Sequence, residues 1–110
     1  MTGVQTCALP ISAFPGLRWV LCHAGGLQNE QAIAIAKANK NVWLDIQGQS
    51  VDNIRRMIAE LGPERLMFGS DWPFFAVAAL LARLLIATEG DDKVRNMLYS
   101  ENARRFWGLE

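Results

Sequence analysis

Three polar residues stand at regular intervals along the chain, each after a short apolar stretch. They are His23, Gln47 and Asp71, and the stretches before them are rich in the branched and aromatic residues that favour β-strands. An imidazole and a carboxylate can transfer protons near neutral pH, and both bind metal ions. If the stretches are neighbouring parallel strands, the three side chains lie at one edge of a sheet, where α/β proteins hold their active sites. The sequence therefore indicates a pocket suited to acid–base or metal chemistry.

Each candidate also has a structural explanation. His23 is the only histidine, and a single histidine at a strand end often serves capping or packing. Asp71 follows an apolar strand, where a buried carboxylate needs a metal, a cation or backbone donors around it. It is equally suited to cap the next helix or to close an Asx-turn. Asp45, inside the second strand, is expected to be a hydrogen-bonded structural residue. The residues alone leave these alternatives open.

Helical patterns follow each of the three stretches. The strands are predicted over residues 17–22, 41–46 and 65–69. Helices are predicted over residues 30–40, 51–61 and 74–88, and two short ones begin near Asp91 and at Ser100. Asn29 and Ser50 are the expected caps of the first two helices. Because antiparallel hairpins use far shorter connections, the strands are expected to be parallel and the fold class α/β.

The composition excludes several kinds of partner. Eleven Lys and Arg residues balance 11 Asp and Glu residues, so the net charge of zero does not favour nucleic acid or an anionic membrane. The longest apolar run, residues 74–86, is too short to span a bilayer and contains Arg83, so it is expected to form a buried helix. Cys7 and Cys22 allow at most one disulfide, and Cys22 is expected to be a packed, reduced thiol. These features favour a cytoplasmic protein with a small-molecule substrate.

The first eleven residues do not read as part of a domain. They show neither a strand nor a helix period, and no basic segment precedes their short apolar part, as a signal peptide would require. Their amino-acid sequence resembles the one obtained by translating a DNA sequencing adaptor. We therefore expect residues 1–11 to be a non-native segment and residues 12–110 to be a C-terminal piece of a longer protein.

Four segments together resemble a known family. FPGLRWVLCHAGG, NVWLDIQG, ERLMFGSDWPF and NARRFWGL are similar, in order and spacing, to the last part of the amidohydrolase-related proteins. These are metal-dependent TIM-barrel hydrolases that include lactonases and decarboxylases of the aminocarboxymuconate-semialdehyde type. The resemblance covers residues 14–109. It implies a partial TIM barrel, in which the three strands are the sixth, seventh and eighth of a (β/α)8 barrel and the C-terminal helices pack outside.

The resemblance also implies roles for single residues. His23 matches the histidine at the end of strand six, which activates the water on the metal or polarises the substrate. Asp71 matches the aspartate at the end of strand eight, which contacts the metal and accepts a proton. Gln47 and Trp72 are expected to bind the substrate. The implied cofactor is a divalent metal, with zinc expected, but the family's ligands on strands one and five have no counterpart in this sequence.

The implied function is that of a fragment of a metal-dependent hydrolase or decarboxylase acting on a small carboxylate or lactone. Because catalytic zinc sites normally use three protein ligands, the fragment is expected to be inactive alone. The alternative is a non-catalytic α/β module that self-associates through its exposed sheet edges. A third interpretation, a phosphorylated ligand bound at Gly25 and Gly26, ranks last because the loop lacks charged residues besides His23.

Overall fold

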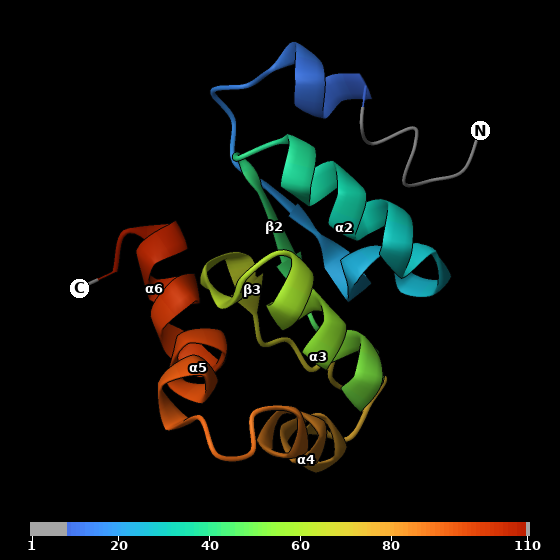
Figure 1. The fold of residues 1–110 in the computed structure, drawn as a ribbon, viewed down its shortest axis with the longest axis vertical. Coiled ribbons are helices and arrows are strands. Elements are labelled where there is room, and N and C mark those ends of the chain that lie inside the picture. Colours follow the sequence, from blue (N-terminus) through green and yellow to red (C-terminus); the bar gives the residue numbers. More distant parts are fainter. Residues whose placement is uncertain (1–8, 110) are drawn as a thin grey trace.

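A three-stranded parallel sheet forms the centre of the molecule. The computed structural model describes residues 9–109, and Figure 1 shows the sheet among its helices. The strands are β1 (Trp19–Leu21), β2 (Val42–Asp45) and β3 (Leu66–Met67), in the order β1-β2-β3. Leu21 pairs with Leu44, and Leu44 pairs with Leu66, so the carboxyl ends of the strands lie together. The prediction of a parallel α/β fold is confirmed.

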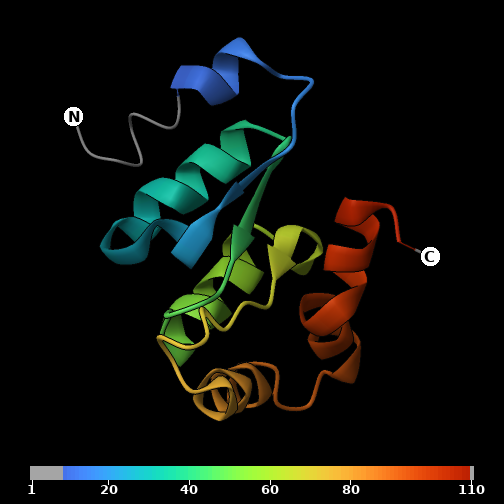
Figure 2. The same ribbon diagram turned by 180° about the vertical axis from the view of Figure 1, so that it is seen from behind.

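Helices follow each strand, as the spacing predicts. They are η1 (Cys22–Gln28), α2 (Asn29–Ala38), α3 (Val51–Glu60), η2 (Pro63–Arg65), α4 (Val77–Ala87), α5 (Asp92–Asn96), η3 (Met97–Glu101) and α6 (Asn102–Trp107). A short helix over residues 9–13 precedes β1. In both views, α2, α3 and α4 follow one another along one side of the molecule and α5 and α6 lie on the other (Figures 1 and 2). None of these helices has the length and apolarity needed to cross a bilayer.

Helix α3 forms where the sequence predicts it. Its apolar residues recur at helical spacing, and Ile54 and Met57 are buried. The hydroxyl of Ser50 accepts a hydrogen bond of 3.1 Å from the backbone N–H of Asn53, which satisfies one of the free donors at the helix start. The predicted cap at Ser50 is confirmed, so the position of α3 after β2 is fixed by both its cap and its buried face.

Helix α4 differs from the prediction in its start and its burial. It begins at Val77 rather than at Phe74, because the backbone N–H of Phe74 bonds to the carbonyl of Asp71 and closes a turn first. Leu80 and Leu84 are buried, but Leu85 and Ile86 are each 51% exposed. The expected buried helix is therefore a surface helix with one covered face.

Two other helix predictions need correction. Asn29 is not a cap but the first residue of α2, where its buried amide donates to the carbonyl of Ala24. The two separate C-terminal helices are one continuous stretch, because the π-helical residues Met97–Glu101 join α5 to α6 without a break at Ser100.

The core lies between the sheet and the helices that follow it. Its fully or nearly fully buried side chains include Val42, Leu44, Leu66, Leu84 and Leu98. Ile11, which the adaptor hypothesis leaves outside the fold, is also fully buried in this cluster. Residues 1–8 of the proposed adaptor segment lie outside the described residues.

Candidate active site

His23 and Asp71 meet at the carboxyl end of the sheet. His23 follows β1 and Asp71 follows β3, with β2 between the two strands. The Nε2 atom of His23 lies 3.5 Å from the Oδ2 atom of Asp71. The side chains are 42% and 38% exposed, so solvent and small molecules can reach both. Their predicted proximity is confirmed, and the Asp71 carboxylate is exposed enough that it needs no buried compensating group.

Both residues have an unusual backbone conformation. The φ angle is 57° at His23 and 55° at Asp71, in the left-handed region that residues other than glycine adopt uncommonly. Ala24, after His23, is also left-handed, with φ at 45°. The residue that caps α4 is Ala76, and no side chain donates or accepts a capping hydrogen bond there. The suggested capping role of Asp71 is therefore wrong.

Asp45 connects the loops around this pair. Its Oδ1 atom accepts hydrogen bonds from the backbone N–H groups of His23, at 2.9 Å, and Gln47, at 3.3 Å, while Oδ2 accepts from the Gln47 amide at 3.1 Å. The residue is only 9% exposed. Burial raises the pKa of the Asp45 carboxyl, and the hydrogen bonds from His23 and Gln47 oppose that rise. The expectation of a hydrogen-bonded structural residue is confirmed.

Cys22 differs from its expected packing. It is a free cysteine and is exposed at the end of β1. Partial burial of the thiol and then the negative charge of Asp45 raise its pKa. Because the reactive form is the thiolate, this raised pKa disfavours nucleophilic chemistry at Cys22.

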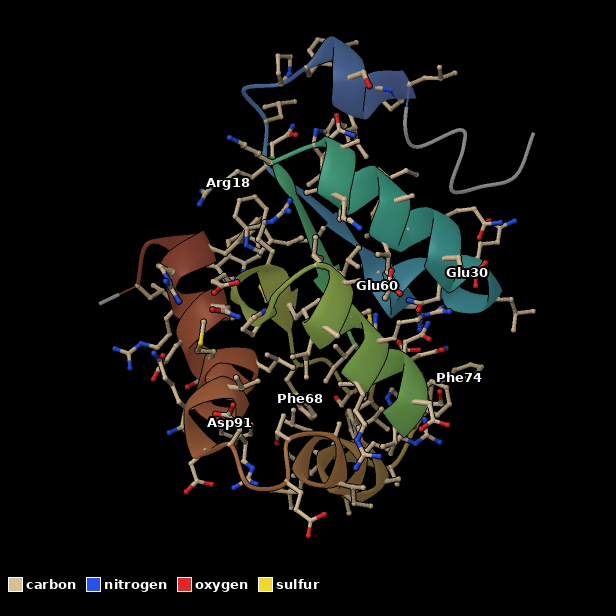
Figure 3. The ribbon with its side chains drawn as sticks, in the orientation of Figure 1. Arg18, Glu30, Glu60, Phe68, Phe74 and Asp91 are labelled. Atoms are coloured by element: carbon tan, nitrogen blue, oxygen red, sulfur yellow. The ribbon has the colours of Figure 1, made fainter. Side chains whose placement is uncertain are left out.

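A cleft of about 410 Å³ opens beside His23. Its walls come from the loops after β1, β2 and β3, and its lining includes His23, Gln47, Gln49, Ser50, Asn53 and Phe75. Trp72 does not line this cleft and is 72% exposed. Phe74, labelled in Figure 3, lies on the same side of the molecule, near the start of α3, and is 84% exposed.

Sequence reasoning missed several residues of the cleft, among them Gln49 and Phe75. Gln49 is 4% exposed and donates to the carbonyls of His23 and Gly26. The apolar run from Phe74 predicts a helix, so the sequence does not indicate that Phe75 lies in a loop and lines the cleft. Gln49 could have been found from its position, because it lies two residues after Gln47 in the loop that follows a strand.

The described residues offer only part of a metal site. Asp71 carries a carboxylate and His23 an imidazole, and both are accessible ligand types. No group of three or more His, Cys, Asp or Glu side chains within residues 9–109 is arranged to hold a metal ion. The described residues therefore do not form a complete metal site, although the types of Asp71 and His23 suit metal ligands.

The sequence model of the amidohydrolase family matches residues 11–109. The chain belongs to the amidohydrolase family. No curated protein sequence gives a significant match. The fold is nevertheless shared with several solved structures, all below 25% sequence identity.

Three of these structures illustrate the similarity of this amidohydrolase chain. Amidohydrolase 2 from Bifidobacterium longum subsp. infantis has 19% identity and a TM-score of 0.76 over 98% of this chain and 47% of the other. A dihydroxybenzoic acid decarboxylase from a Polaromonas species, with bound manganese and the inhibitor 2-nitroresorcinol, has 18% identity and a TM-score of 0.71 over 96% and 40%. An amidohydrolase from Burkholderia multivorans with bound zinc has 22% identity and a TM-score of 0.68 over 97% and 49%.

The amidohydrolase chain spans 36–51% of the length of the similar structures. Its three parallel strands and their helices therefore correspond to a part of the barrel, as the predicted partial TIM barrel requires.

Proposed function

We propose that this chain contributes one side of the active site of a metal-dependent enzyme that decarboxylates or hydrolyses a small carboxylate or lactone. The observation that carries the proposal is the 3.5 Å approach of His23 Nε2 to Asp71 Oδ2 at the carboxyl end of a parallel sheet. In α/β barrels, the loops at this end hold the catalytic groups.

The two side chains have complementary roles in this proposal. The Asp71 carboxylate accepts a proton, and the His23 imidazole beside it stabilises the charge that develops on the substrate. Gln47 adds an amide to the cleft wall and can donate to a substrate oxygen. Trp72, which stands outside the cleft, is proposed to contact the substrate only where it projects from the pocket.

A divalent metal fits this arrangement if other strands of the barrel supply the rest of its ligands. Asp71 would supply one oxygen ligand, and the other ligands would come from parts of the barrel beyond this chain. When bound, such a metal acts as a Lewis acid and activates water near neutral pH. The solved structures with manganese and with zinc support a divalent metal, and we propose zinc.

The substrate class follows from the cleft and the relatives. Phe75 gives the cleft an apolar wall, whereas Gln47, Ser50 and Asn53 give it polar groups. A small aromatic carboxylate matches this combination, and one similar structure is a dihydroxybenzoic acid decarboxylase. Aromatic carboxylates are therefore the first substrates to assay, followed by lactones.

The test uses the longer gene product that joins this chain to the rest of the barrel. We expect His23→Ala and Asp71→Asn each to lower kcat about 100-fold or more, the scale of a lost acid–base group. Asp52→Asn, an exposed carboxylate in the first turn of α3, is the control and should keep normal turnover. The 110-residue chain alone should show neither turnover nor stoichiometric zinc. Tight zinc and turnover in the chain alone would overturn the proposal.

A non-catalytic, self-associating module is the second candidate. Large apolar side chains are exposed on α4 and on the C-terminal helices, including Leu85, Ile86, Tyr99 and Trp107. The two candidates differ in the upstream sequence, because the enzyme requires a His-x-His pair near the start of the barrel and another histidine about midway. A gene without these histidines would favour the module.

A further inference from the structure

The loop that carries His23 has a conformation that its own sequence does not favour. Four consecutive residues, 23–26, have positive φ angles, and the first two of them are not glycines. A left-handed backbone at His23 and Ala24 is strained, so such a conformation persists only where surrounding groups hold it. Two side chains in the structure do so: Asp45 at the end of β2 and Gln49 in the loop that follows.

Asp45 holds the loop at the backbone N–H of His23. The carboxylate oxygen Oδ1 accepts that hydrogen bond at 2.9 Å. Asp45 is itself held because Oδ2 accepts from the Gln47 amide. Because Asp45 ends β2, the bond fixes the start of the loop to the neighbouring strand.

Gln49 holds the loop at its carbonyl groups. Its Nε2 atom donates to the carbonyl of His23 at 2.5 Å and to that of Gly26 at 3.0 Å. The Gln49 side chain is oriented by Asn53, whose amide donates to Gln49 Oε1 at 2.8 Å. Arg83 from α4 donates to the backbone carbonyl of Gln49. The backbone N–H and the backbone carbonyl of His23 are therefore both bound by buried polar side chains.

This hold determines where the imidazole lies. The Nδ1 atom of His23 is 3.5 Å from the position that a Cβ atom on Gly48 would occupy, and the Phe75 ring lies 3.7 Å from that same position. The other ring nitrogen, Nε2, faces Asp71. We propose that Asp45 and Gln49 are positioning residues that clamp the His23 backbone in its left-handed conformation and so hold the imidazole against Asp71. The effect of this clamp on turnover rests on the proposed function. The clamp itself rests only on the hydrogen bonds described above.

The test takes advantage of the single histidine in the chain. In NMR spectra of the 110-residue protein, the His23 ring protons can be assigned without ambiguity. We expect nuclear Overhauser contacts from this ring to the α-protons of Gly48 and to the Phe75 ring. Gln49→Glu keeps the shape of the side chain but removes both donors, and these contacts should be lost. Asp45→Ala should lose them too, whereas Asp45→Asn keeps an acceptor oxygen and should retain them.

Asn102→Ala is the matched control. The buried amide of Asn102 also donates to two backbone carbonyls, those of Pro63 and Leu66, but it lies in α6, away from the loop. This variant should lose stability and keep the His23 contacts. Contacts that persist in Gln49→Glu and Asp45→Ala, or that disappear equally in Asn102→Ala, would overturn the clamp.

A second measurement is needed if one of these variants fails to fold as the isolated chain. In the longer enzyme, Gln49→Glu should lower kcat at least 10-fold with KM and metal content unchanged, because the Gln49 amide donates to the carbonyls of His23 and Gly26 rather than into the cleft. An unchanged kcat with full activity of the parent enzyme would contradict the clamp. If the parent enzyme lacks activity while the NMR contacts respond as expected, the proposed function fails and the clamp stands.

Discussion

Asp71 illustrates how a single residue can be accessible and still be held in place. Its side chain is 38% exposed, yet its backbone φ of 55° and the turn it closes with Phe74 fix its direction toward His23. A carboxylate with this exposure needs no buried counter-charge, since water solvates it. It is therefore free to exchange protons or to bind a metal, which a fully buried carboxylate could do only at a large cost.

Asp45 gives a pH-dependent prediction at the same scale. Burial raises its pKa above the ordinary value of 3.8, so the folded protein binds this proton more tightly than the unfolded chain does. The free energy of unfolding should therefore fall as pH rises from about 3.8 through the raised pKa, and then level off.

Asp45→Asn lacks this titration and serves as the reference. Urea unfolding at a series of pH values should show the wild type losing stability relative to Asp45→Asn as the pH increases across that window. A wild type that gains stability over Asp45→Asn with rising pH would contradict the environment described for Asp45.

Helix α4 allows a test at the scale of elements with two adjacent leucines. Leu84 is 1% exposed and lies in the core, whereas Leu85 is 51% exposed. Leu84→Ala should lower the free energy of unfolding by about 2–5 kcal/mol, because it leaves a cavity. Leu85→Ala should cost less than about 1 kcal/mol. Chemical denaturation of the isolated chain checks both values, and equal losses would show that the helix is oriented differently.

The elements also show what sequence patterns can predict. Helix α3 was predictable because a capping serine, Ser50, precedes apolar residues at helical spacing, and both signals agree. The start of α4 was not, because the apolar run from Phe74 hides a turn that begins at Asp71. The π-helical segment before Asn102 was also hidden, since composition does not distinguish one hydrogen-bond register from another.

The sequence predicts the pair at the site but not the residue that supports it. The proximity of His23 and Asp71 followed from parallel strands whose carboxyl ends share one edge. The contribution of Gln49 depends on the left-handed loop at His23, which no periodic pattern encodes. The catalytic and substrate-binding roles of His23, Gln47, Asp71 and Trp72 stay predictions.

The whole molecule exposes surfaces that a complete barrel would cover. Within residues 9–109, β1 and β3 are the outer strands of the sheet and have no further strand beside them. By contrast, Arg18, labelled in Figure 3, covers the Phe106 ring of α6. Open sheet edges and exposed apolar helix faces favour association between chains.

We therefore expect the isolated chain to self-associate. Sedimentation velocity at increasing protein concentration should show oligomers at micromolar concentrations. Leu85→Lys places a charge on the exposed face of α4 and should reduce any association through that helix without affecting association through the sheet edges. A monomer at all concentrations would contradict the expectation.

The central claim is that His23 and Asp71 act as one unit in the enzyme to which this chain belongs. The most direct test is a double-mutant cycle in kcat/KM on the longer gene product, with His23→Ala, Asp71→Asn and the double variant. Because residues that act together give non-additive losses, the double variant should be little slower than the slower single variant. Losses that multiply, or a single variant with unchanged turnover, would contradict the claim.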